Sequence, residues 1–190
     1  MTEHIDAIVD KAYKNLGFVL RNCKPFSNLN CVKSVYYAYV RSVLEYASSI
    51  WSPYYITYIQ RIEKIQAKFI KHLNYRVHTY SDYSIGCTRH KIMPLVDRRT
   101  SLDVMLLYNI VNGHLDAPAL LSNININVPR KRTRHTTLFL PPFQNTKYAS
   151  NAPISRISST YNKKFSDLDI FNTSKNTFKN KVFQQLLGTE

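Results

Sequence analysis

Apolar residues recur at helical spacing through most of the first 115 residues. Positions separated by three or four residues are apolar in four successive stretches, at about 3–21, 29–50, 54–74 and 94–112. This spacing places the apolar side chains on one face of an α-helix. Glycine is scarce, with 4 residues, whereas folds with many tight hairpins normally need more of it. The pattern therefore predicts a mainly α fold that begins with a helical bundle.

The pattern changes beyond residue 115. Residues 124–128 alternate apolar and polar side chains, residues 136–140 favour extended backbone, and Pro141 and Pro142 end the pattern. Alternation with a period of two is typical of a β-strand. We therefore expect a small β-hairpin at about 124–140 and one or two helices after it. The predicted organisation is a helical domain over 1–115 and a basic α/β tail over 116–190.

Charge is the next informative property. The chain has 26 Lys and Arg against 12 Asp and Glu, a formal net charge of +14. Such an excess repels itself in a compact chain and favours a polyanionic partner, most commonly nucleic acid. A membrane surface is the main alternative, but no run of about 18 apolar residues could span a bilayer.

The start of the chain and its cysteines bear on location. Glu3, Asp6 and Asp10 are atypical of a signal peptide or of an acid-poor transit peptide. The 3 cysteines are an odd number, which favours reduced thiols over a disulfide framework. We expect a nuclear or cytoplasmic protein that is not secreted.

The stretch at 54–74 combines an apolar face with a separate positive stripe. The basic residues recur at i, i+3, i+7 and i+10, and one more follows just past the end: Arg61, Lys64, Lys68, Lys71 and then Arg76. Glu63 is the only acid of the stretch, so the i, i+4 acid–base pairs that usually neutralise a solvated helix face are mostly missing. The stripe is predicted to contact phosphates; the alternative is an ordinary solvated face.

Two further groups of basic residues stand out. One is the cluster Arg130, Lys131, Arg132 and Arg134, which suits a phosphate clamp, a nuclear localisation signal or a flexible loop. The other is the pair Arg98 and Arg99, which falls early in a helix, where the helix dipole disfavours positive charge. An acid such as Asp97 or Asp103, or else a phosphate, should offset that pair.

Four aromatic residues allow two interpretations. Tyr36, Tyr39, Tyr46 and Trp51 lie on or next to the broad apolar face of the 29–50 stretch. Aromatic rings can stack on nucleic-acid bases, but on such a face they belong more often to the core. We expect core positions, with Trp51 filling a junction between helices.

Catalytic and metal motifs are missing from the sequence. Cys87 and His90 form one closely spaced pair, whereas tetrahedral zinc needs four ligands. Asp167 and Asp169 could share one side of an extended strand, but they are better explained as turn acids before a helix. No Gly-rich phosphate loop or nucleophile motif occurs. We expect no catalytic residue, metal site or cofactor in this chain.

A series of short strings spans nearly the whole chain in a fixed order. They are KNLGF at 14–18, VRSVLEY at 40–46, WSP at 51–53, RIEKIQAKF at 61–69, RR at 98–99, YNIVNG at 108–113, NVP at 127–129, APISR at 152–156 and YN at 161–162. This ordered set resembles the region that follows the catalytic palm in non-LTR (LINE-like) retrotransposon reverse transcriptases, especially those of jockey-type elements.

The resemblance implies a helical thumb that grips a template–primer duplex. In that family the palm carries the aspartates that bind two Mg²⁺ ions, and this sequence has no Asp-Asp dipeptide. Mg²⁺ is therefore expected only in the absent palm, and the chain is not expected to polymerise alone. The implied function is part of an RNA-directed DNA polymerase that binds an RNA–DNA hybrid or duplex through phosphates, with the palm and fingers as protein partners. The alternatives are a free-standing nucleic-acid-binding protein derived from such an element, or a helical remnant without function.

Overall fold

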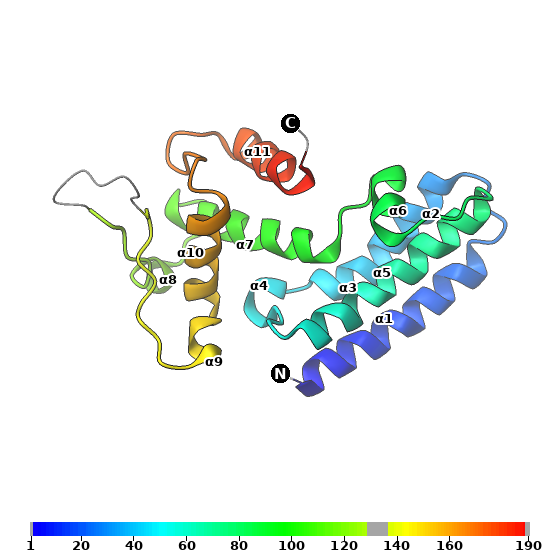
Figure 1. The fold of residues 1–190 in the computed structure, drawn as a ribbon, viewed down its shortest axis with the longest axis horizontal. Coiled ribbons are helices and arrows are strands. Elements are labelled where there is room, and N and C mark those ends of the chain that lie inside the picture. Colours follow the sequence, from blue (N-terminus) through cyan, green and yellow to red (C-terminus); the bar gives the residue numbers. More distant parts are fainter. Residues whose placement is uncertain (1, 129–136, 189–190) are drawn as a thin grey trace. The chain divides into compact units, whose positions relative to one another are not determined.

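The computed structural model describes residues 2–128 and 137–188, and most of these residues are helical. Figure 1 shows the helices along the chain. In order they are α1 (Thr2–Asn22), α2 (Leu29–Tyr36), the π-helix η1 (Tyr37–Arg41), α3 (Ser42–Glu45), α4 (Ser48–Trp51), α5 (Ile56–Arg76), α6 (Tyr83–His90), α7 (Leu95–Val111), α8 (Pro118–Leu121), α9 (Lys147–Ser150), α10 (Pro153–Lys164) and α11 (Lys175–Leu187). The chain divides into two compact units between Arg99 and Thr100.

The first unit is built around α1, the α2–η1–α3 segment and α5. The buried side chains of α1 follow the predicted three- and four-residue spacing: Ile5, Val9, Ala12, Leu16 and Val19. Those of α5 do so too, with Ile62, Ile65, Phe69 and Leu73 among them. Fully burying such a side chain contributes about 1.5–3 kcal/mol. The helical bundle that the apolar pattern predicts is therefore confirmed.

α1 and α5 lie side by side and run in the same direction (Figure 1). Near their start Asp6 pairs with Arg61, and at their end the Cys23 carbonyl accepts a hydrogen bond from Arg76 at 3.1 Å. These contacts join residues 55 and 53 positions apart, so the register hardly changes along the pair. The basic residues of α5 therefore follow the edge that α5 shares with α1.

The helix expected at about 29–50 is interrupted twice. The π-helix η1 widens one turn, and such a turn leaves backbone groups in need of partners. Asn15 of α1 supplies one, because its side-chain amide donates to the Tyr39 carbonyl at 2.7 Å. The helix then ends at Tyr46, and Ala47 takes a left-handed conformation with φ 50°. No glycine or proline marks either break in the sequence, so the prediction of one continuous helix was wrong.

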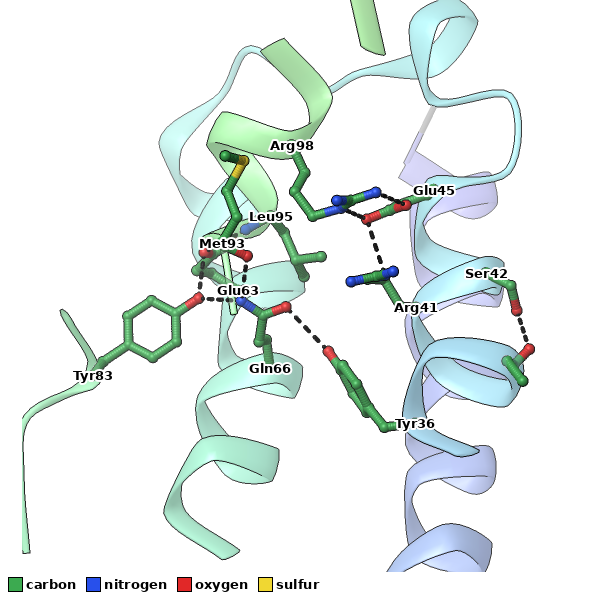
Figure 2. A network of polar contacts seen from close by, with 11 residues as sticks. Tyr36, Arg41, Ser42, Glu45, Glu63, Gln66, Tyr83, Met93, Leu95 and Arg98 are labelled. Carbon is green, nitrogen blue, oxygen red and sulfur yellow. Dashed lines mark hydrogen bonds and ion pairs between the residues drawn. The ribbon is translucent and has the colours of Figure 1, made fainter. Parts of the chain in front are cut away.

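A buried amide joins several segments of the first unit, as Figure 2 shows. The Gln66 side chain is fully buried. It accepts a hydrogen bond from the Tyr36 hydroxyl at 3.2 Å and donates to the Tyr83 hydroxyl at 2.9 Å and to the Met93 carbonyl at 3.0 Å. These bonds satisfy the amide and connect α5 with α2, α6 and the segment before α7.

Arg98 finds its acid on a distant helix. Its guanidinium makes two hydrogen bonds to the Glu45 carboxylate, one of them at 2.9 Å, and Arg41 Nε approaches the same carboxylate at 3.6 Å (Figure 2). The expected offset by an acid is thus confirmed for Arg98, but α3 supplies that acid as Glu45, and it is neither Asp97 nor Asp103.

The second unit has its own core, formed by α7, α10 and α11. Asp103 pairs with Arg156 at 3.0 Å, and both side chains are largely buried. Tyr108 stacks on Phe178 with ring centroids 4.7 Å apart. Most of α7 thus packs into the second unit, which explains why the division falls after Arg99 and not near residue 115. Helices α10 and α11 occupy the tail where one or two helices were expected.

The expected β-hairpin is not supported. In the parts of 124–140 that the structure describes there is no β-strand, only one antiparallel bridge between Ile126 and Phe139. Asn162 of α10 binds both backbone groups of Phe139, at 3.1 Å and 2.6 Å. Pro141 and Pro142 follow Leu140 and lack the N–H groups that a longer ladder requires. The Asn162 side chain therefore makes the hydrogen bonds to the Phe139 backbone that a neighbouring strand would otherwise make.

The contact between α5 and α6 yields a prediction about Gly86. An added Cβ at this position would lie 2.4 Å from Ile70 Cγ2 and 3.2 Å from Asn74 Nδ2. We expect Gly86→Ala to lower the free energy of unfolding by about 1–3 kcal/mol because of overpacking, despite the better helix propensity of alanine. Urea unfolding followed by circular dichroism would measure it.

Gly17 of α1 is the matched control for Gly86. Its added Cβ would meet only the end of the Arg21 side chain, at 3.4 Å. Gly17→Ala should therefore raise the free energy of unfolding by about 0.5–1 kcal/mol. Equal stabilisation by both substitutions would contradict the close packing of α6 on α5.

Candidate nucleic-acid interface

The positive stripe of α5 is present on the surface of the first unit. Lys64, Lys68 and Lys71 are at the surface, and Arg61 is partly exposed. Their spacing of three and four residues puts them on adjacent turns of one helix face. We call Lys64, Lys68 and Lys71 the α5 lysines.

Glu63, the only acid of α5, is directed toward Tyr83 and Leu95 (Figure 2). Its carboxylate accepts hydrogen bonds from the Tyr83 hydroxyl at 2.5 Å and from the Leu95 backbone N–H at 2.9 Å. The second bond satisfies an amide at the start of α7, where helices carry N–H groups without intrahelical partners. Burial raises the pKa of Glu63 above its ordinary value, although the Tyr83 hydrogen bond opposes this shift.

The α5 lysines differ in their surroundings. Lys68 Nζ lies 5.7 Å from the centre of the Tyr13 ring, within the range of a cation–π contact. No residue in the described ranges forms an ion pair with Lys64 or Lys71. Both ammonium groups are therefore available to an anion from solution.

Arg61 and Arg76 are engaged inside the unit. Arg61 pairs with Asp6 at 2.6 Å, and both side chains are about two-fifths exposed, at 42% and 43%. A pair in such contact with solvent contributes little, about 0–1 kcal/mol, so a phosphate could compete for Arg61. Arg76 donates to the Cys23 carbonyl at 3.1 Å and to the Phe26 carbonyl. We assign Arg76 to holding the turn between α1 and α2.

The basic cluster Arg130, Lys131, Arg132 and Arg134 lies outside the residues that the structure describes. Whether it acts as a clamp, a localisation signal or a loop stays a prediction.

The four aromatic residues separate into two pairs. Tyr36 is fully buried and stacks on Phe69 with centroids 3.9 Å apart, and Trp51 is buried while its indole N–H donates to the Tyr46 carbonyl. Tyr39 and Tyr46, in contrast, are 53% and 81% exposed. The expectation of core positions was wrong for these two, because η1 turns Tyr39 outward and the helix ends at Tyr46.

The residues weighed as metal ligands have structural partners. His90 is buried with Nε2 2.8 Å from Asn74 Oδ1, and Cys87 is buried nearby on α6. Asp169 Oδ1 accepts hydrogen bonds from the backbone N–H groups of Phe171 and Asn172. Within the described part of the chain, no group of three His, Cys, Asp or Glu residues could hold a metal ion.

The first unit thus presents positive charge and exposed aromatic rings on helices that pack around a common core.

None of the helices in the described ranges is long and apolar enough to cross a membrane. Comparisons with protein-family models, curated proteins and solved structures found no match for this chain.

Measurements of unfolding free energy can test which basic side chains are available to an anion from solution and which are engaged inside the unit. Arg76→Gln should lower the free energy of unfolding by about 1.5–3 kcal/mol, since it removes charge-assisted hydrogen bonds to two carbonyls. Lys71→Gln, with the same loss of charge on the same helix, should stay within about 0.5 kcal/mol of the wild type. Urea unfolding would decide, and equal effects would contradict the assignment of Arg76 to the α1–α2 turn.

The raised pKa of Glu63 predicts that the stability of the folded protein depends on pH. Because its pKa is raised in the folded state, the folded protein holds a proton on Glu63 more readily than the unfolded chain. Its contribution to stability therefore falls as pH rises from the ordinary value of 4.5 through the raised pKa. Glu63→Gln keeps an acceptor for Tyr83 and Leu95 but does not titrate.

The measurement for Glu63 is urea unfolding of the wild type and of Glu63→Gln across this pH range. The difference in free energy of unfolding should shift in favour of the variant as pH rises, with a slope of at most about 1.4 kcal/mol per pH unit. A constant difference, or a shift in favour of the wild type, would contradict a raised pKa of Glu63 in the folded state.

Proposed function

We propose that this chain binds double-stranded nucleic acid, an RNA–DNA hybrid or a duplex, through phosphate contacts of the α5 lysines, as the thumb-like part of a non-LTR reverse transcriptase. The observation that carries the proposal is the asymmetry of α5. Its lysines face solvent, with Lys64 and Lys71 outside every ion pair of the described residues, while Glu63 is turned inward and bound by Tyr83 and Leu95. An anion that approaches α5 meets positive charge and no acid of that helix.

The geometry suits a phosphate backbone better than base edges. Lys64 and Lys71 are seven residues apart, which corresponds to about 10 Å along a helix. Successive phosphates of one strand are about 3.4 Å apart along a duplex, so the α5 lysines span about three of them. Flexible ammonium groups act as point charges and carry no pattern that would select a base. Binding without sequence preference follows.

Two further observations support the polymerase context. The net charge of +14 favours a polyanionic partner. The strings that resemble the reverse transcriptases at 40–46, 61–69 and 98–99 also supply Glu45, Gln66 and Arg98, the residues whose contacts fix the first unit. The resemblance thus falls on residues that determine the packing of the helical bundle. In this proposal the palm and fingers would supply the Mg²⁺ chemistry, and this chain would hold the duplex.

The test is binding of the full chain to a labelled RNA–DNA hybrid and a DNA duplex over a salt series. In Lys64→Gln/Lys68→Gln/Lys71→Gln, the slope of log affinity against log salt should fall by about 0.9 for each phosphate that the variant no longer neutralises. Changing the duplex sequence should leave both affinities unaltered.

The matched control removes the same charge from the second unit. Lys175, Lys179 and Lys181 of α11 are exposed, and their triple change to Gln should leave the slope close to that of the wild type. Equal slopes for all three proteins, or an equal fall in both triple variants, would overturn the assignment of the duplex to α5.

A further inference from the structure

A second surface lies where α1 packs against η1 and α3. A groove of about 490 Å³ opens there, lined by His4, Ile8 and Lys11 of α1 and by Val43, Tyr46 and Trp51 across from it. Further along α1, Asn15 bonds to the Tyr39 carbonyl and the Phe18 ring lies 6.1 Å from the Tyr39 ring. We call this row, from His4 to Phe18 on α1 with its facing residues from Tyr39 to Trp51, the α1–η1 seam.

The seam exposes large aromatic rings. Phe18 and Tyr39 are 49% and 53% exposed, and Tyr46 is 81% exposed. Exposed rings along one row offer faces on which bases can stack, as in proteins that bind single strands. The backbone carbonyl of Tyr39 accepts a hydrogen bond from Asn15 within the π-helix η1, and π-helical turns are frequent at functional sites.

The α1 row that lines the seam carries a lysine and no acid. It consists of positions 4, 8, 11, 15 and 18, and the lysine is Lys11. Lys14 is exposed and lies one turn before Phe18 and three residues after Lys11, so helical spacing places it at the rim. Across the seam Glu45 is the nearest acid in sequence, and Arg98 and Arg41 hold its carboxylate (Figure 2). Glu3 and Asp10 belong to the neighbouring row of α1 together with Lys14, so the charge at that rim is mixed and Lys11 is the cation within the seam row itself.

We propose that the α1–η1 seam binds single-stranded nucleic acid, with bases stacked on Phe18, Tyr39 and Tyr46 and phosphates at Lys11 and Lys14. The proposal rests on the proposed function, because it assigns an unpaired strand to the partner whose duplex contacts the α5 lysines. Stacking on a side chain needs a free base face, which paired and stacked bases inside a duplex do not offer.

The length of the seam fits a short strand. From His4 to Phe18 the row covers 14 residues, about 21 Å along α1. A stacked strand advances about 3.4 Å per nucleotide, which gives room for about six nucleotides. α1 separates the seam from the α5 lysines, since Asp6 and Tyr13 contact α5 while Asn15 and Phe18 contact η1. The two surfaces can thus be tested independently.

The experiment uses the full chain and a dT12 oligonucleotide. Trp51 is the only tryptophan of the chain and lines the groove, so its intrinsic fluorescence reports occupancy of the seam. We expect dT12 to change this fluorescence at saturation. Tyr39→Ala should weaken the affinity by about 5- to 150-fold, the range observed for loss of one base–aromatic stack, whereas Tyr39→Phe keeps the ring and should bind as the wild type does.

Tyr80→Ala is the control for Tyr39→Ala. Tyr80 is 93% exposed and lies between α5 and α6, so its loss removes an exposed ring without altering the seam and should leave dT12 binding unchanged. The proposal is overturned by an unchanged Trp51 signal, by wild-type affinity in Tyr39→Ala, or by equal losses in Tyr39→Ala and Tyr80→Ala. A wild type that is dimeric in size-exclusion chromatography and becomes monomeric in Tyr39→Ala would also overturn it, because the seam would then be a self-association surface.

Each of the two proposals can be rejected independently of the other. Lys64→Gln/Lys68→Gln/Lys71→Gln should weaken duplex binding and leave the dT12-induced change of Trp51 fluorescence intact, while Tyr39→Ala should do the reverse. A triple variant that binds the duplex as the wild type does rejects the α5 assignment alone, and a Tyr39→Ala variant that binds dT12 as the wild type does rejects the seam alone.

Discussion

The buried amide of Gln66 is the contact on which the first unit depends. An amide taken out of water destabilises the fold unless its groups are hydrogen-bonded. Gln66 meets this condition with three partners from three segments, Tyr36, Tyr83 and Met93. A shift of any of these segments would leave a polar group unsatisfied in the core, so the amide selects one packing among those that apolar contacts alone would allow.

That packing also decides what α5 presents to solvent. Gln66 and Glu63 face inward and bind the segments that precede and begin α7, while the lysines occupy the exposed face of the helix. Because the only acid of the helix is used to satisfy the start of another helix, the lysines have no acid of α5 beside them. The inward orientation of Glu63 thus both satisfies the start of α7 and leaves the exposed face of α5 positive.

α1 links the two proposed surfaces of the first unit. One side of α1 meets α5 through Asp6 and Tyr13, and another side meets η1 through Asn15 and Phe18. A strand that is paired along one part and unpaired along another presents phosphates in the first part and free base faces in the second. The α5 lysines beside one edge of α1 and the aromatic rings beside the other edge match these two requirements.

The helical class, the apolar rows of α1 and α5 and the positive face of α5 follow from the order of residues alone, because helical periodicity is a local property. That order by itself did not determine which cations are engaged. Arg98 meets Glu45 and Arg76 meets the Cys23 carbonyl, each 53 positions away, and no local pattern encodes such pairings. Nor did it reveal the π-turn that exposes Tyr39, or the side chain of Asn162 that takes the place of a β-ladder. These features arise from long-range packing, since the burial of polar groups and their hydrogen bonds depend on which segments meet in space.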